Sequence, residues 1–142
     1  MDTQKGKIFR ILDANANRAR EGLRVVEDYC RFVLDDEELS AELKRMRHDV
    51  TQQVSAIGTT SALLQARDSE SDVGANEPEP AQRDQAQPAQ VVLANIKRAE
   101  EALRCLEEYS KALDTACAES FKRIRFELYT LEKKVAPRLG ER

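Results

Sequence analysis

Two stretches of the chain, ANANRAREGLRVVEDY at residues 14–29 and ANIKRAEEALRCLEEY at residues 94–109, match each other at an offset of 80 residues. Nine of the sixteen aligned positions are identical, whereas average composition predicts roughly one identity by chance. A second match follows at an offset of 78, between KRMR at 44–47 and KRIR at 122–125. The chain therefore carries an internal duplication, and each repeat predicts a long helix, a tight turn and a second helix.

Apolar residues recur at helical spacing in all four expected helices. The first helices of the two repeats carry the stripes Leu12, Ala16, Ala19, Leu23, Val26, Cys30, Val33 and Val92, Ile96, Ala99, Leu103, Leu106, Ser110, Leu113. The second helices carry Leu39, Leu43, Met46, Val50, Val54 and Phe121, Ile124, Leu128, Leu131. Asp36 and either Asp114 or Thr115 are expected to cap the second helices.

A single helical hairpin cannot bury its apolar stripe, so two related hairpins are expected to pack together. The predicted fold is all-α, an antiparallel four-helix bundle made of two duplicated helical hairpins with pseudo-twofold symmetry. We expect one domain over residues 1–142, with repeat one at about 8–66, a connector at about 67–90 and repeat two at about 91–136. The connector is rich in proline, and TTSALLQAR, just before it, is expected to form a further short helix.

Composition excludes several classes of protein. The 26 acidic and 23 basic residues give a net charge of -3 without a basic stripe, which argues against nucleic acid as a partner. The chain shows neither a membrane span nor a signal peptide, so we expect no membrane association and a cytoplasmic location. It also lacks both common glycine-rich nucleotide loops, so side chains or helix N-termini must hold any phosphate. Three cysteines and one histidine form no zinc motif, and the cysteines are interpreted as reduced core thiols.

Most identities between the repeats are polar: Asn15/Asn95, Arg18/Arg98, Glu21/Glu101, Arg24/Arg104, Glu27/Glu107 and Tyr29/Tyr109. Packing needs only the apolar stripe, and asparagine is a weak helix former, so the repeated asparagines need a reason. One interpretation is structural: Asn and Arg bridge neighbouring helices, and Glu and Arg three residues apart form surface ion pairs. The other is a polar binding site beside the apolar stripe.

Arg67, Asp68 and Asp72 come together in ARDSESDVG, where the apolar periodicity ends. They are typical of a solvated turn after a helix. The same residue types could also hold Mg²⁺ and contact a phosphate.

These strings carry a resemblance to a known family. ILDANANRAREGLRVVEDYCRFVLDD, LKRMRHD, ARDSESDVG, ANIKRAEEALRCLEEYSK and YTLEK resemble the small monofunctional hydroxymethylpyrimidine-phosphate kinase domain of thiamine biosynthesis. The resemblance covers residues from about 8 to 135. That domain occurs alone or fused before a thiamine-phosphate synthase barrel, so the synthase is an expected fused or functional partner.

The resemblance implies a kinase that uses ATP and Mg²⁺ to convert 4-amino-5-hydroxymethyl-2-methylpyrimidine phosphate to the diphosphate, without acting on the free alcohol. For such a reaction we expect guanidinium groups to neutralise the phosphates, and assign this catalytic role to Arg18, Arg24, Arg98 and Arg104. Substrate contacts are expected from Asn15, Asn95, Arg67, Glu21 and Glu101. Asp68 and Asp72 are the expected Mg²⁺ ligands, with Glu21 and Glu101 as the alternative.

Two other functions remain open at this point. The chain could be a non-catalytic helical module for docking or dimerisation associated with thiamine-phosphate synthase, since it lacks a glycine-rich phosphate loop. It could also be a structural four-helix protein with an ionic interior. A homodimer is compatible with each of these functions.

Overall fold

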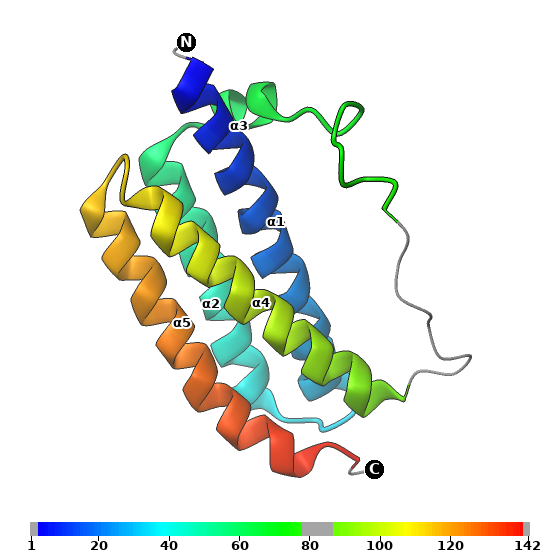
Figure 1. The fold of residues 1–142 in the computed structure, drawn as a ribbon. Coiled ribbons are helices and arrows are strands. Elements are labelled where there is room, and N and C mark those ends of the chain that lie inside the picture. Colours follow the sequence, from blue (N-terminus) through cyan, green and yellow to red (C-terminus); the bar gives the residue numbers. More distant parts are fainter. Residues whose placement is uncertain (1–2, 78–86, 141–142) are drawn as a thin grey trace.

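The computed structural model describes residues 3–77 and 87–140, and these residues form helices without any strand. The elements are α1 (Thr3–Phe32), α2 (Glu37–Ile57), α3 (Thr60–Ala66), α4 (Pro88–Ser110), α5 (Thr115–Val135) and the short 3₁₀ helix η1 (Ala136–Arg138). Figure 1 shows them along the chain. The short helix expected after Gly58 is α3.

The four long helices form the predicted antiparallel bundle. α1 packs against α2 and α4, and α5 packs against α4 and α2. Each neighbouring pair runs in opposite directions, with α1 and α4 side by side on the face seen in Figure 1. The equivalent helices α1 and α4 are therefore neighbours, as are α2 and α5. This arrangement agrees with the expected pseudo-twofold relation between the hairpins.

Side-chain caps start the second helices of the two repeats. The Asp36 carboxylate accepts a hydrogen bond from the Leu39 N–H, and Asp114 accepts from the N–H groups of Ala116 and Cys117. Both capping predictions are confirmed, with Asp114 as the second cap. The expected connector extended to residue 90, but α4 already begins at Pro88, because proline fits the first turn of a helix, where its missing N–H is not needed.

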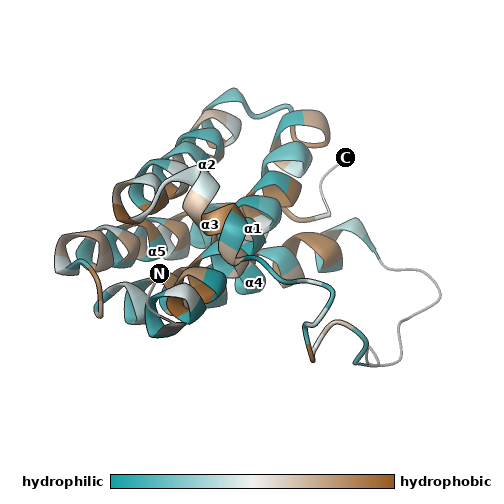
Figure 2. Cartoon of the chain, turned by 90° about the horizontal axis from the view of Figure 1, so that it is seen from above, coloured by the Kyte–Doolittle hydropathy of each residue, from teal (hydrophilic) through white to brown (hydrophobic). Residues whose placement is uncertain are grey.

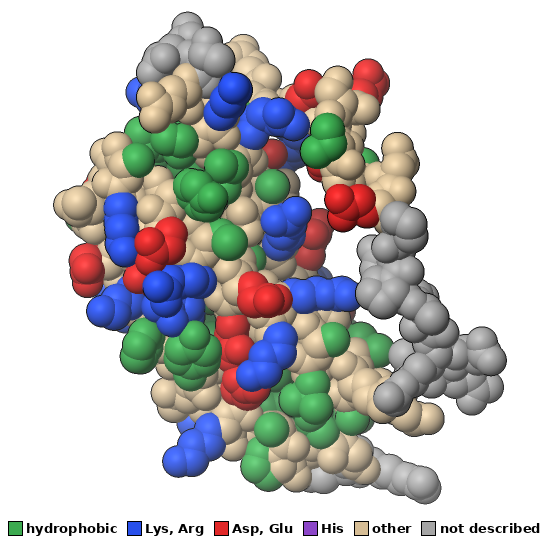
Figure 3. Space-filling model, viewed as in Figure 1, with side chains coloured by type: hydrophobic (Ala, Val, Ile, Leu, Met, Phe, Trp, Pro, Cys, Tyr) green, Lys and Arg blue, Asp and Glu red, His purple; other side chains and the backbone are tan. Residues whose placement is uncertain are grey.

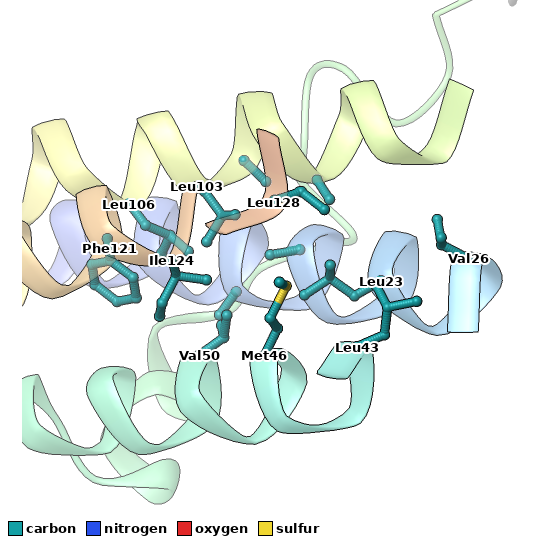
Figure 4. Close-up of a cluster of buried hydrophobic side chains, with 14 of the residues drawn as sticks. Leu23, Val26, Leu43, Met46, Val50, Leu103, Leu106, Phe121, Ile124 and Leu128 are labelled. Atoms are coloured by element: carbon teal, nitrogen blue, oxygen red, sulfur yellow. The ribbon is translucent and has the colours of Figure 1, made fainter. Parts of the chain in front are cut away.

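The predicted apolar stripes form the core. Every member of the two second-helix stripes is buried, and Figure 4 shows Met46, Val50, Phe121, Ile124 and Leu128 meeting side chains from the first helices. Hydrophobic and hydrophilic residues alternate around each long helix in Figure 2.

Two expected core positions differ from the prediction. Val33 is 42% exposed, because α1 ends at Phe32 and the chain turns away from the core. Leu113 is only partly buried, since it lies in the turn between α4 and α5. Within the described ranges, no helix combines the length and the hydrophobicity that crossing a bilayer would require.

Candidate functional site

A groove of about 620 Å³ runs between α1 and α4. Its ten lining residues are five pairs that the offset of 80 relates: Asn15/Asn95, Arg18/Arg98, Glu21/Glu101, Gly22/Ala102 and Val25/Cys105. This central groove therefore lies across the pseudo-twofold axis between the repeats, and each repeat supplies half of it. Figure 3 shows basic and acidic side chains gathered over the face that α1 and α4 form.

The floor of the central groove is a close contact between the two helices. A Cβ atom at Gly22 would lie 2.9 Å from the backbone oxygen of Asn95 and 3.3 Å from the Ala99 Cβ. Only glycine allows so close an approach to the backbone of α4. Gly22 therefore allows the first helices of the two repeats to approach each other closely.

The two asparagines make equivalent hydrogen bonds. Asn15 Nδ2 donates to the carbonyl oxygen of Ile11 at 2.9 Å, and Asn95 Nδ2 donates to that of Val91 at 2.8 Å. Asn15 is buried, and its Oδ1 accepts a long hydrogen bond of 3.5 Å from Arg18 Nη1. These backbone contacts fix both amides at the wall of the groove. An amide has a second N–H and an acceptor oxygen for other partners.

Arg18, Arg98, Glu21 and Glu101 place two guanidinium groups and two carboxylates along the groove. All four residues are exposed, so their charges are hydrated at little cost. Guanidinium groups can bind phosphate oxygens two at a time. Mg²⁺ usually takes one or two protein carboxylates together with phosphate oxygens and water, which suits the two glutamates of the groove.

Arg24 and Arg104 lie outside the central groove. Arg24 Nε is 3.5 Å from Asp28 Oδ1, and Arg104 Nε is 3.0 Å from Glu108 Oε1, with each arginine side chain more than half exposed. Arg24 lines a separate hollow between α1 and the start of α2. Of the four arginines predicted to bind phosphate, the structure thus places only Arg18 and Arg98 in one groove. The expected surface ion pairs with Glu21 and Glu101 are replaced by pairs with the carboxylate four residues further along the helix.

Arg67, Asp68 and Asp72 also lie apart from the groove. Arg67 donates two hydrogen bonds, of 2.8 and 2.9 Å, to the buried carboxylate of Asp13, and this contact raises the pKa of the guanidinium. Asp68 accepts from the Ser71 N–H, and Asp72 accepts from the Gly74 N–H.

These residues line a small hollow beside the N-terminal half of α1, where Arg67 ties the chain after α3 to α1. In the part of the chain that the structure describes, no group of three or more His, Cys, Asp or Glu residues is arranged to hold a metal ion.

Two ion pairs between the helices of a hairpin, one partly buried and one buried, were not anticipated from the sequence. Arg47 Nε donates to Glu27 Oε1 at 2.7 Å, and Arg125 Nη2 donates to Glu107 Oε1 at 2.7 Å. Each pair joins the first helix of a repeat to the second. The signal was present in the duplication, because both glutamates match at the offset of 80 and both arginines match at the offset of 78.

The cysteines are free thiols. Cys30 and Cys117 are buried, as a core thiol should be, and burial raises the pKa of Cys30 to about 11. Cys105 differs, since it is only partly buried and lines the central groove opposite its equivalent Val25.

The comparisons with known proteins agree with one another. Residues 10–134 match the model of the ThiD2 family. A protein of Nostoc punctiforme named thiamine-phosphate synthase is 43% identical over 128 residues, covering 90% of this chain and 35% of that protein. Proteins of the same name from a Synechococcus species and from Thermosynechococcus vestitus are 47% and 42% identical, covering 89% of this chain in each case and 34% and 35% of their own length.

The chain thus spans about a third of the length of these curated relatives. No solved structure was found to match it.

Proposed function

The chain belongs to the ThiD2 family, and from this membership and the central groove we propose that it is a kinase of thiamine biosynthesis. It transfers the γ-phosphoryl group of ATP to 4-amino-5-hydroxymethyl-2-methylpyrimidine phosphate, with Mg²⁺, and does not act on the free alcohol. The relatives support this proposal, because they carry the name of the enzyme that consumes the diphosphate product. A kinase domain joined to that enzyme would supply its substrate directly.

The observation that carries the proposal is the placement of Arg18 and Arg98 in one groove, one from each repeat. Both reacting groups of this reaction are phosphates. An oxygen of the pyrimidine phosphate attacks the γ-phosphorus, the bond from that phosphorus to the β,γ-bridging oxygen breaks, and ADP leaves with that oxygen. Transfer of this kind depends on positioning and on charge neutralisation, which two guanidinium groups can supply.

No general base is needed in this mechanism. A phosphate monoester is largely deprotonated near neutral pH, since its second pKa is about 6. The free alcohol lacks this anionic oxygen. It would also leave a guanidinium group of the groove without its phosphate partner, so we expect it to be excluded.

Glu21 and Glu101 are the proposed carboxylates for the Mg²⁺ that accompanies ATP, because they line the same groove as the two arginines. Bound Mg²⁺ would neutralise phosphate charge. Asp68 and Asp72 remain the alternative. Two double variants separate these sets: Glu21→Gln with Glu101→Gln, and Asp68→Asn with Asp72→Asn. The double variant that removes the Mg²⁺ ligands should need a higher Mg²⁺ concentration for half-maximal activity.

A coupled assay tests the proposed kinase activity, with ATP, Mg²⁺ and the pyrimidine phosphate or the free alcohol as substrates and thiamine-phosphate synthase added to trap the diphosphate. We expect turnover of the phosphate alone. Arg18→Met and Arg98→Met should each lower kcat/KM about 100-fold or more, the cost typical of removing one transition-state donor.

Arg123→Met is the matched control, because that exposed side chain lies on α5, away from the groove. Arg24→Met and Arg104→Met test the other two arginines that the sequence predicted to be catalytic. If they lower kcat/KM as much as Arg98→Met does, Arg24 and Arg104 also take part in catalysis.

The second candidate is a docking module without catalysis, which the greater length of the relatives favours. Absence of turnover for both compounds, with a folded protein and an active synthase, would reject the kinase. Binding of the chain to the synthase under the same conditions would then support docking.

A further inference from the structure

We propose that the base of ATP binds in an apolar hollow at one end of the central groove, so that the nucleotide enters from the end of α1 and the start of α4. This inference rests on the proposed kinase function and adds the direction in which the two substrates lie. The apolar hollow has a volume of about 420 Å³, and its apolar side chains include Val25, Phe32, Val33, Pro88 and Val91.

The apolar hollow and the central groove are continuous. Val25 lines both of them, on the α1 side. On the α4 side, the carbonyl oxygen of Val91 holds the amide of the groove residue Asn95. Figure 3 shows hydrophobic side chains at the lower end of α1 and α4, next to the band of charged side chains. A ligand with an apolar ring and a charged tail could occupy both.

Several apolar side chains of the hollow are exposed to solvent and do not belong to the hydrophobic core. Phe32 is 65% exposed, Val33 is 42% exposed and Val91 is 38% exposed. The Arg31 guanidinium lies 4.7 Å from the centre of the Phe32 ring, which leaves ring surface for a second planar group. The carboxylate of Asp28 lies at the same hollow and can accept a hydrogen bond from the exocyclic amine of adenine.

The opposite end of the groove differs. The offset of 80 that relates the repeats places Ala112 where Phe32 stands and Ile8 where Pro88 stands. The opposite end carries the 44% exposed Tyr109, but it has no equivalent of the exposed Phe32 ring or of Pro88. The duplication leaves both ends as candidates for the nucleotide, and the apolar hollow lined by Phe32 and Pro88 favours the α1 end.

The distance between the apolar hollow and the arginines favours ATP, and not the pyrimidine phosphate, as the ligand whose ring occupies the hollow. Val91 precedes Arg98 by seven residues, a distance of about 10 Å along a helix. In the pyrimidine phosphate a single methylene group separates the ring from the phosphate ester, so its ring must stay close to the arginines. In ATP the ribose and the α- and β-phosphates separate the base from the γ-phosphate, and they can span this distance.

In-line transfer then places the second substrate. The attacking and leaving oxygens lie on opposite sides of the γ-phosphorus. With ADP leaving toward the apolar hollow, the pyrimidine phosphate lies toward Asn15, Ala102 and Cys105. The transferred phosphoryl group is then close to the pseudo-twofold axis, between Arg18 and Arg98.

Isothermal titration calorimetry with ATP and with inorganic triphosphate tests the base subsite directly. Wild-type protein should bind ATP more tightly than triphosphate. Phe32→Ala should weaken ATP binding about tenfold, within the range that base–aromatic stacking contributes, and leave triphosphate binding unchanged. Val91→Asp should weaken ATP binding as well, and helix α4 should tolerate an acidic residue near its N-terminus.

Phe126→Ala is the matched control, because Phe126 is also an exposed phenylalanine but lies on α5. Equal affinities for ATP and triphosphate in the wild type would overturn the inference, as would unchanged ATP binding in Phe32→Ala. Weaker binding of the pyrimidine phosphate, with ATP binding unchanged, would overturn it too.

The kinase activity and the base subsite can fail independently of each other. Turnover with an unchanged KM for ATP in Phe32→Ala would reject the subsite and keep the kinase. The expected binding pattern without turnover would keep the subsite and reject the kinase. Absence of ATP binding would reject both.

Discussion

The two hairpins, α1 with α2 and α4 with α5, share the ion pair that joins their helices but differ at neighbouring polar positions. Each joins its helices through an ion pair at equivalent positions, Glu27–Arg47 and Glu107–Arg125. Beside the pair, Arg20 donates to Asn17 Oδ1 at 2.6 Å in the first hairpin. At the equivalent position, Glu100 lies 3.4 Å from the Lys97 ammonium group in the second. The duplication thus preserved what holds each hairpin together, while the neighbouring polar positions diverged.

A second difference, within the part of the chain that the structure describes, is that a short additional helix packs on α1 and not on α4. Helix α3 packs on α1, and Arg67 binds the buried carboxylate of Asp13. The position equivalent to Asp13 is Leu93, which is 38% exposed. Among the described residues, one wall of the central groove is therefore held by an extra element, α3, whereas the other wall is held by its packing within the bundle.

The largest expected effect comes from breaking the ion pair that is buried within the second hairpin. Arg125→Met should lower the free energy of unfolding by about 3–5 kcal/mol, because it leaves the Glu107 carboxylate buried without its partner. The Arg125 side chain is 8% exposed and also donates to the Tyr129 hydroxyl, whereas the Arg47 side chain is 16% exposed. Arg47→Met should therefore cost less. Urea unfolding followed by circular dichroism measures both losses.

The double variant Glu107→Gln with Arg125→Met is the second arm of this test, since it removes the unpaired charge and should recover part of the loss. Arg123→Met, on the same helix but exposed, should change little. A loss below about 1 kcal/mol for Arg125→Met would show that the ion pair does not hold the second hairpin.

A smaller effect is expected at the contact between the two hairpins. Gly22→Ala should lower the free energy of unfolding by about 1–3 kcal/mol despite the better helix propensity of alanine, because the new methyl group meets the backbone of α4. The matched change is Ala102→Gly, which costs about 1 kcal/mol through helix propensity and also loses one buried methyl group. Only Gly22→Ala should weaken substrate binding, since it separates the walls of the groove. Increased stability in Gly22→Ala would contradict the close contact.

The fold could be predicted well because one physical rule governs it. Residues such as Leu43 and Leu128 follow the helical period, and burial of an apolar stripe depends on that period alone. Val33 was placed wrongly, because the period continues past the point where α1 ends. The start of α4 was missed at Pro88, since a proline favours a connector and the first turn of a helix equally.

The site was harder to predict, because polar side chains reach in directions that sequence spacing does not determine. Arg18 and Arg24 looked alike in the duplicated strings, yet Arg18 lines the central groove and Arg24 faces Asp28. The substrate contact expected of Arg67 stays a prediction, and nothing in the sequence indicated that Arg67 donates to Asp13, which lies 54 residues away. Contacts of this range depend on the packed structure.

The smallest expected effect is a difference in pH dependence between the hairpins. The Glu100 side chain is 8% exposed, and its Oε2 has no hydrogen-bond partner among the described residues. Burial, with the nearby Glu132 carboxylate, raises the pKa of Glu100 from 4.5 to about 7, while Lys97 opposes this shift. Lys97 also lies 2.9 Å from Glu132 Oε2, and the pKa of Glu132 is lowered, chiefly by its interaction with the Glu100 carboxyl group.

The sign of the effect follows from proton binding. Between pH 4.5 and about 7 the folded protein keeps a proton on Glu100 that the unfolded chain has lost, so the Glu100 contribution to the free energy of unfolding increases as the pH falls through this range. Glu100→Gln should remove this contribution, and it should stabilise the protein at pH 8, where the wild type buries a charged carboxylate. Arg20→Gln, at the equivalent position of the first hairpin, should leave the pH dependence unchanged. Thermal unfolding at pH 5.5 and pH 8 compares the three proteins, and identical pH profiles for Glu100→Gln and the wild type would show that the carboxylate titrates as it does in water.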